Sequence, residues 1–209
     1  MNENAMNPSI CAIILAAGSS TRMGQPKQLL PLKGRPLLEH VIRTAASANF
    51  SEIITVIGCE ADNIQKAILI DDPRFRWVVN EDYLSGQGSS LKAGFINVAD
   101  HHSGVMVFLG DLPFIVQSTV QSIFQLGKDM LKEYEKSFVI QPKYKGISGH
   151  PVFFGHQDKN IFMKLQGDRG AKVIMNQISC RQSIPVEDSG ILFDIDTPEA
   201  YNKAVSLNK

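Results

Sequence analysis

Residues 13–27 of the chain are Ile-Ile-Leu-Ala-Ala-Gly-Ser-Ser-Thr-Arg-Met-Gly-Gln-Pro-Lys. The apolar run 10–15 that leads into this stretch is short and rich in β-branched residues, so we expect a buried strand there. The small side chains that follow let a ligand approach main-chain N–H groups, which can bind an anion. Arg22 can bind phosphate oxygens in a bidentate manner, and Lys27 adds a point charge. The stretch therefore predicts a triphosphate-binding loop, and a simple turn with two solvated cations is the alternative.

Length and composition limit the class of protein. The chain has 209 residues, 44% of them hydrophobic and 20% charged, with a formal net charge of zero. These values are typical of one sizeable globular domain, and they give no overall attraction to nucleic acid or to an anionic membrane. Cys11, Cys59 and Cys180 lie far apart and form no Cys-x-x-Cys pair, which favours reduced core residues over disulfides or a zinc site.

The N-terminus carries no basic segment, and the early apolar run is too short to span a membrane. We therefore expect a cytoplasmic protein without a membrane or nucleic-acid partner. We also expect a single domain over residues 1–209, with a flexible segment at 1–9.

Apolar runs alternate with helical patterns along the chain. We expect strands at 10–15, 53–58, 75–80, 105–109, 138–140, 152–154 and 191–196. We expect helices at 36–45, 61–70, 117–134 and 171–177, and a further helix that begins within 85–94. This alternation predicts a doubly wound, mostly parallel sheet, which binds ligands at the carboxyl ends of its strands.

Two carboxylates follow strand candidates at that edge. Asp111 lies in Gly-Asp-Leu-Pro directly after the strand at 105–109, where it is placed for a metal ion; a turn aspartate that caps its own backbone is the alternative. In the strand expected at 191–196, alternation puts Asp194 and Asp196 on the same side. Because Thr197 and Pro198 then begin a helix, Asp196 also fits a capping role.

The motif Leu-Ala-Ala-Gly-x-Ser-x-Arg-Met-Gly-x-x-Lys at 15–27 resembles the signature loop of the nucleotidyltransferase superfamily, and more narrowly that of the MocA-type molybdenum cofactor cytidylyltransferases. The resemblance covers nearly the whole chain, from residue 13 to about 204. It implies a single-domain α/β fold of the Rossmann-like, nucleotide-diphospho-sugar transferase type, with a mostly parallel twisted sheet flanked by helices. One departure is Leu112, where the family motif has Met or Gln; this changes shape and leaves Asp111 in place.

The resemblance also implies roles for individual residues. Arg22, Lys27 and Asp111 are the expected catalytic residues, and Asp111 and Asp196 the expected ligands of Mg²⁺, with Asp194 in reserve. Seven residues are expected to bind the nucleotide: Leu15, Ala16, Ala17, Gly18, Ser20, Gln87 and Ser90. Three are expected near the acceptor: His150, Asp168 and Arg169. His150 could equally be structural, Asp168 could be a helix cap, and Arg169 could be solvated.

The implied reaction joins CMP from CTP to the terminal phosphate of molybdenum-molybdopterin, giving molybdopterin cytosine dinucleotide and pyrophosphate. A xanthine dehydrogenase-type apo-enzyme, or its maturation factor, is the implied partner. Ala17 adds a methyl group where a purine would lie, which favours CTP over GTP by shape. A guanylyltransferase, a sugar- or methylerythritol-phosphate nucleotidyltransferase, and a non-catalytic cofactor carrier are the alternatives. The intact carboxylates and Arg/Lys loop argue against the carrier.

Overall fold

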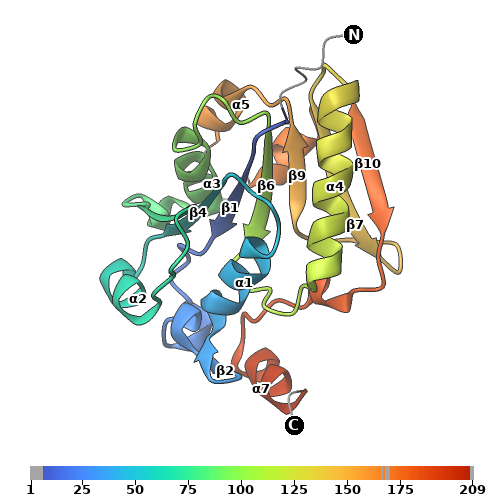
Figure 1. The fold of residues 1–209 in the computed structure, drawn as a ribbon. Helices are drawn as coiled ribbons and strands as arrows, with labels where there is room; N and C mark the ends of the chain where they lie inside the picture. Colours follow the sequence, from blue (N-terminus) through green and yellow to red (C-terminus); the bar gives the residue numbers. More distant parts are fainter. Residues whose placement is uncertain (1–6, 166, 168–169, 208–209) are drawn as a thin grey trace.

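One twisted sheet organises the molecule (Figure 1). The computed structural model describes residues 7–165, 167 and 170–207. The sheet has the order β10-β7-β9-β6-β1-β4-β5, with β8 paired to β7. Its strands are β1 (Ile10–Leu15), β4 (Glu52–Ile57), β5 (Phe75–Val79), β6 (Gly104–Leu109), β7 (Phe138–Tyr144), β8 (Ile147–Ser148), β9 (Val152–Gly155) and β10 (Cys180–Pro185).

The sheet is mostly parallel. Strand β1 pairs in parallel with β4 and β6, and β4 with β5, while β10 pairs in parallel with β7. Strand β9 runs antiparallel between β6 and β7. The predicted α/β class with a mostly parallel, helix-flanked sheet is therefore confirmed.

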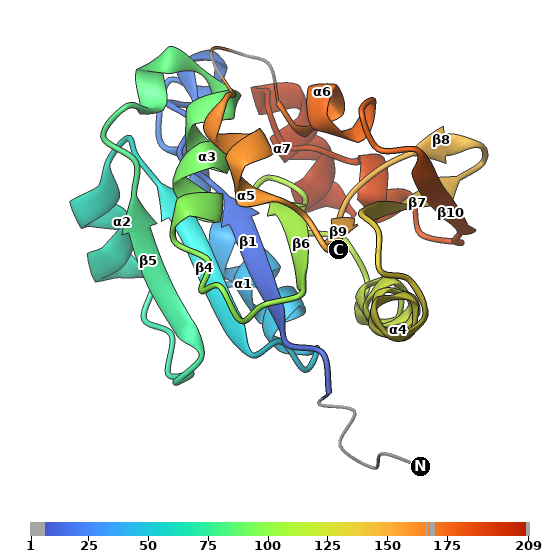
Figure 2. The same ribbon diagram turned by 90° about the horizontal axis from the view of Figure 1, so that it is seen from above.

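Helices cover both faces of the sheet (Figure 2). On one face lie α1 (Leu37–Ala46), α2 (Ala61–Ala67) and α4 (Gln117–Glu133). On the other lie α3 (Gln87–Ile96), α5 (Lys159–Met163) and α6 (Ala171–Met175). The continuous apolar runs of β1 and β6 follow from this, because strands covered on both faces bury every side chain.

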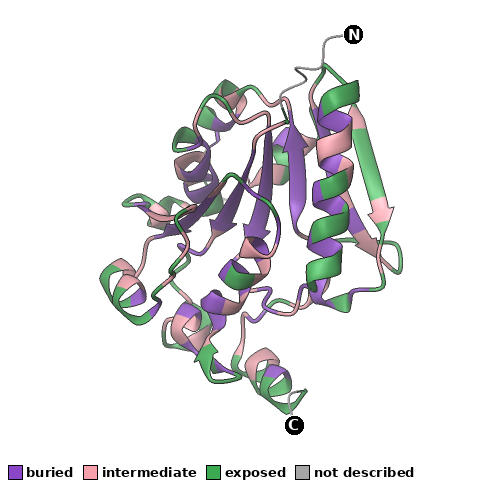
Figure 3. Cartoon of the chain, viewed as in Figure 1, coloured by how far each residue is buried: buried purple, intermediate pink, exposed green. Residues whose placement is uncertain are grey.

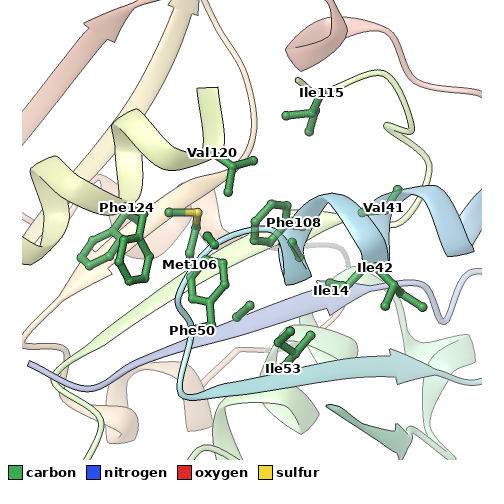
Figure 4. Close-up of a cluster of buried hydrophobic side chains, with 14 of the residues drawn as sticks. Ile14, Val41, Ile42, Phe50, Ile53, Met106, Phe108, Ile115, Val120 and Phe124 are labelled. Carbon is green, nitrogen blue, oxygen red and sulfur yellow. The ribbon is translucent and has the colours of Figure 1, made fainter. Parts of the chain in front are cut away.

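The core on the α1/α4 face is aromatic at its centre (Figure 4). Phe50 meets Phe108 and Phe124 edge to face, with ring centroids 6.1 and 5.0 Å apart. Met106 and Val120 are fully buried beside them. This packing fixes β6 against α4, and β6 carries Asp111 just beyond its end.

A smaller layer lies beyond the carboxyl ends of the parallel strands. It contains the hairpin of β2 (Pro31–Leu32) and β3 (Arg35–Pro36) and the last helix, α7 (Pro198–Ser206). Leu30, Leu37, Ile195 and Ala204 form its apolar core. In the part of the chain that is described, no helix has the length and apolarity needed to cross a membrane.

The sequence prediction was wrong for the last strand. Residues 191–196 do not join the sheet: η4 (Ser189–Leu192) is a 3₁₀ helix, and residues 193–196 are irregular. Its apolar residues are buried for another reason, since Ile195 packs under α7. The edge strand is instead β10, which is mostly exposed and polar and was not predicted (Figure 3).

Candidate active site

The loop after β1 is held by a buried glutamine. Gln28 is 3% exposed and donates hydrogen bonds from Nε2 to the carbonyls of Ala16 (2.8 Å) and Gly18 (2.9 Å). The Lys27 N–H donates to Ser20 Oγ at 3.1 Å, and Ser20 itself has a positive φ of 53°. The hydroxyl of Ser20 is thus used to shape the loop. Gln28 was missed from sequence, where only its position beside Lys27 could have indicated a role.

Asp111 and Asp196 come from segments far apart in the sequence and lie side by side. The main-chain N–H of Ile195 donates to the carbonyl of Asp111 at 3.0 Å, which holds the 193–196 segment against the end of β6. Close approach on the other side depends on Gly110, because an added Cβ would lie 2.8 Å from Cβ of Ala16 and 3.0 Å from the carbonyl of Leu15. Asp111 and Asp196 therefore face the signature loop together.

Lys27 lies between these carboxylates. Its Nζ donates to Asp111 Oδ2 at 2.7 Å and also to Asp196 Oδ1. Arg22 lies in η1 (Thr21–Met23) and donates to Asp196 Oδ2 at 2.7 Å, although its side chain is 69% exposed. The structure thus brings together all four charged residues expected from the sequence. Asp194, the reserve candidate, is exposed and does not line the cavity described below.

Burial and charge act in opposite directions on this cluster. Burial raises the pKa of Asp111 above its ordinary value, although the Lys27 ammonium opposes the shift. Burial also pushes the pKa of Asp196 upward, but the bond from Lys27 and the charges of Lys27 and Arg22 outweigh it, and the pKa is lowered. For Lys27, burial alone lowers the pKa, yet the two carboxylates leave it raised. Lys27 therefore stays protonated at neutral pH.

The carboxylate pair suits a divalent cation. Asp111 Oδ1 is buried and has no hydrogen-bond partner among the described residues, so it offers a free oxygen ligand. Asp196 lies near enough to share one ammonium group with Asp111. Mg²⁺ and Mn²⁺ prefer oxygen ligands of this kind, and Mg²⁺ sites combine one or two carboxylates with substrate phosphates.

A cavity of about 390 Å³ opens over the loop and the carboxylates. The described residues that line it include Leu15, Ala16, Ala17, Gly18, Lys27, Tyr83, Leu84, Gln87, Ser90, Asp111 and Asp196. Six of the seven expected nucleotide-binding residues thus border one space, and Ser20 does not.

Buried Asn80 orders the far wall of this cavity. The end of β5 carries Asn80, whose Nδ2 donates to Ser89 Oγ (2.9 Å) and Ser90 Oγ (3.1 Å) at the start of α3. Tyr83 and Leu84, in η3 (Tyr83–Ser85), form the rim, and Leu84 is 79% exposed. Neither Asn80 nor this rim was singled out from the sequence.

A second cavity of about 660 Å³ adjoins the first, and Leu15, Gln87 and Leu109 line both. His150 lines the second cavity, where its Nδ1 is buried without a hydrogen-bond partner among the described residues. Burial lowers the pKa of His150 to about 4, so its ring is neutral at pH 7. Lys172 and Arg181 bring positive charge to the same cavity. The other two expected acceptor residues, Asp168 and Arg169, lie outside the described residues.

The family model for the MobA-like NTP transferase domain matches residues 12–183. That range contains the signature loop, Asp111, and the strands β1 and β6, whose last residues Leu15 and Leu109 line both cavities. The chain belongs to the MobA-like NTP transferase family. The predicted membership of the nucleotidyltransferase superfamily, with a likeness to its molybdenum cofactor branch, is thereby confirmed.

Two relatives match nearly the whole chain, and a third matches about half of it. Purine catabolism protein PucB of Bacillus subtilis is 28% identical over 94% of this chain and 96% of its own length. Nicotine blue oxidoreductase of Paenarthrobacter nicotinovorans is 30% identical over 92% and 94%. Bifunctional protein GlmU of Alkalilimnicola ehrlichii is 38% identical over 56% of this chain, which is only 25% of its own length.

Solved structures share the fold. Rv0371c from Mycobacterium tuberculosis is 25% identical and superposes with a TM-score of 0.80, covering 95% of this chain and 98% of that one. The same protein has been solved in complex with manganese, with a TM-score of 0.77 over 95% and 98% of the two chains.

Proposed function

We propose that this nucleotidyltransferase joins CMP from CTP to the terminal phosphate of molybdenum-molybdopterin. The observation that carries the proposal is the cluster of Lys27, Asp111 and Asp196, which lines the first cavity, with the second cavity directly adjoining it. One cavity has the features of a nucleotide site and the other those of an acceptor site. A nucleotidyltransferase must hold its two substrates side by side, with the acceptor phosphate facing the α-phosphorus of the nucleotide.

Support for a pyrimidine comes from the floor of the first cavity. Ala17 lines it and also belongs to the buried apolar cluster of the α3 face, so this part of the wall is fixed. A fixed wall with a side chain larger than glycine favours the smaller base. Gln87 lines both cavities, so its side chain is placed to contact both substrates.

Support for an anionic acceptor comes from the second cavity. Lys172 and Arg181 can bind a phosphate, and Arg181 can do so in a bidentate manner. The neutral ring of His150 offers a hydrogen bond from a water-poor wall, which suits an uncharged heterocycle such as a pterin. The name of PucB, a purine catabolism protein, supports a hydroxylase of the xanthine dehydrogenase type as the enzyme served.

In the proposed reaction the acceptor phosphate attacks the α-phosphorus of CTP in line. A new phosphorus–oxygen bond forms, the bond to the β-phosphate oxygen breaks, and pyrophosphate leaves. No protein nucleophile is required, because the acceptor phosphate is ionised at neutral pH. Lys27 and Arg22 exchange their carboxylate partners for phosphate oxygens and stabilise the developing charge.

Asp111 and Asp196 would hold the divalent cation, which when bound neutralises charge on the phosphates. When Lys27 turns to the phosphates, both carboxylates lose their cationic partner, and a divalent cation would replace it. Asp111 Oδ1, which has no hydrogen-bond partner among the described residues, is available as a ligand. The manganese complex of Rv0371c supports a divalent ion in this family, and Mg²⁺ is the ion proposed here.

The test is pyrophosphate release by the purified protein with Mg²⁺ and molybdenum-loaded molybdopterin, with CTP, GTP and ATP in parallel. Release that is fastest with CTP is the expected result. Preference for GTP would leave nucleotidyl transfer standing and overturn the assignment of CTP.

Matched reactions with N-acetylglucosamine 1-phosphate or methylerythritol phosphate examine the acceptor, since the relatives include GlmU. Turnover of either one without molybdopterin would overturn the acceptor assignment. NADH consumption without pyrophosphate release would overturn nucleotidyl transfer in favour of a redox reaction, as the name of the Paenarthrobacter relative suggests.

A further inference from the structure

A second group of possible metal ligands lies at the opposite end of the sheet from the active site. Cys11 is near the start of β1, Glu52 begins β4, and His102 lies in the turn before β6. Because β1 lies between β4 and β6, with Cys11 in register with Glu52, the three side chains converge. Their ligand atoms Sγ, Oε and ring nitrogen all lie within 4.8 Å of one another.

The histidine in this group is already oriented by its neighbours. Ser9 Oγ lies 2.7 Å from Nδ1 of His102, and Glu52 Oε2 lies 3.0 Å from Nε2. Metal-binding histidines are oriented in this way, with one ring nitrogen fixed by a hydrogen bond and the other facing the ion. The His102 side chain is only 2% exposed, so its position is set by packing as well.

The Glu52 carboxylate directs one oxygen atom toward the other two residues of the cluster. Its Oε1 accepts a hydrogen bond from Arg76 Nε at 2.7 Å, which fixes the carboxylate and leaves Oε2 facing His102. Cys11 is fully buried; its thiol donates a long contact of 3.5 Å to the carbonyl of Ala12 and also interacts with the Glu52 side chain. Burial, and the nearby charge of Glu52, raise the pKa of the Cys11 thiol, so the group stays protonated without a cation beside it.

We propose that Cys11, Glu52 and His102 bind one transition-metal ion of the zinc class. Sulfur, nitrogen and oxygen ligands together suit Zn²⁺ and Co²⁺ rather than Mg²⁺. Metal–ligand bonds of about 2.0–2.3 Å put tetrahedral ligand atoms about 3.3–3.8 Å apart, so binding requires spacings of up to 4.8 Å to close by at most about 1.5 Å. Binding releases the thiol proton of Cys11 to solvent, and the metal takes its place beside the carboxylate.

A small cavity lies beside two of the three proposed ligands. A cavity of about 280 Å³ is lined by Glu52, His102 and the exposed His101, whose ring centroid is 4.2 Å from that of His102. An ion can enter there, and water or His101 can complete a tetrahedral set. Such an ion would join β1, β4 and the turn before β6, far from the nucleotide cavity, and so would stabilise the fold.

Cobalt absorption tests this site in the full chain. Metal-free protein carrying Asp111→Asn and Asp196→Asn, which removes the active-site carboxylates, is titrated with Co²⁺. We expect one equivalent to bind with a thiolate-to-cobalt charge-transfer band and the visible bands of a tetrahedral ion. Cys11→Ser should abolish the charge-transfer band. Cys180→Ser, which changes a half-buried cysteine on β10, should leave it intact.

Two further variants keep the test decisive. His102→Gln should weaken Co²⁺ binding more than about 100-fold, and Ser9→Ala about 10- to 100-fold, because Ser9 only orients the ligand. If Cys11→Ser does not fold, His102→Gln gives the same answer. Absence of a thiolate band in the folded starting protein, or a band unchanged by His102→Gln, would overturn the proposal and leave the cluster as a hydrogen-bonded core network.

Discussion

The pKa values of Asp111 and Asp196 are shifted in opposite directions by their surroundings. Burial raises the pKa of Asp111, whereas Lys27 and Arg22 leave the pKa of Asp196 lowered in spite of burial. A carboxylate with a raised pKa costs folding free energy when it is ionised, so stability associated with Asp111 grows as the pH falls through that pKa. Asp111 is thus retained at some cost in stability, as is usual for a group needed in a reaction.

Replacing Asp111 should separate activity from stability. For Asp111→Asn we expect turnover to fall by about 10²–10³, equivalent to about 3–4 kcal/mol of transition-state stabilisation. The midpoint of thermal unfolding at pH 7 should stay the same or rise, since the charge penalty is gone. Pyrophosphate release and calorimetry measure the two effects. Near-normal turnover from folded protein would contradict the proposed role in cation binding.

Gln28 offers a prediction about the shape of the signature loop. Removing its amide in Gln28→Ala leaves the carbonyls of Ala16 and Gly18 without their donor, which should cost about 1–3 kcal/mol of stability. The KM for CTP should rise, because the loop loses the two hydrogen bonds that fix its conformation. Gln25→Ala, an exposed glutamine in the same loop, is the control and should change neither quantity. Equal KM values for the two variants would show that Gln28 does not position the loop.

At the scale of elements, the strands that can be predicted from sequence are those covered by helices on both faces, because both faces then carry apolar residues. Strands β1, β4 and β6 lie inside the sheet, so their sequences are mostly apolar, with Glu52 at the start of β4 and the buried Thr55 as the exceptions. Strand β10 is an edge strand with the sequence Cys-Arg-Gln-Ser-Ile-Pro, and its mostly exposed residues carry no such signal. The apolar spacing at 191–196 is misleading in the opposite sense, because Ile195 packs beneath α7 without pairing to any strand.

The site shows the same limit. The charged residues of the signature loop and both carboxylates were predicted to lie together from motifs at strand ends and from the family resemblance, and the structure brings their side chains into contact. The positions of Gln28, Asn80 and Arg181 beside the cavities were not predicted, because Gln28 and Asn80 make contacts to other elements and Arg181 lies on a strand without an apolar pattern.

Asp188 connects α4 to the segment that carries Asp196. It is 5% exposed, and its Oδ2 accepts from the N–H of Val116 (3.0 Å) and from Thr119 Oγ1 (2.8 Å), while Oδ1 accepts from the N–H of Gly190 (2.9 Å). We expect Asp188→Ala to lower the free energy of unfolding by about 2–3 kcal/mol, since three donors lose a charged acceptor. Glu187→Ala, an exposed neighbour, should change it by less than about 0.5 kcal/mol. Similar denaturant midpoints for both variants would contradict this.

At the scale of the whole molecule, both cores share the central strands, since β1 and β4 contribute residues to each. We therefore expect one cooperative unfolding transition. Ligands that bind only the folded state should raise its midpoint: CTP with Mg²⁺ at 100 times its dissociation constant adds about 2.7 kcal/mol, or about 5–10 °C for a domain of this size.

Chelation of Mg²⁺ should remove most of that shift, because the proposed site at Asp111 and Asp196 then lacks the ion that would join it to the phosphates. Asp111→Asn should remove it even with Mg²⁺ present. Differential scanning calorimetry of both proteins, with and without CTP and Mg²⁺, measures these shifts. A full shift in Asp111→Asn would place the nucleotide elsewhere, and two separate transitions would mean that the faces of the sheet unfold independently.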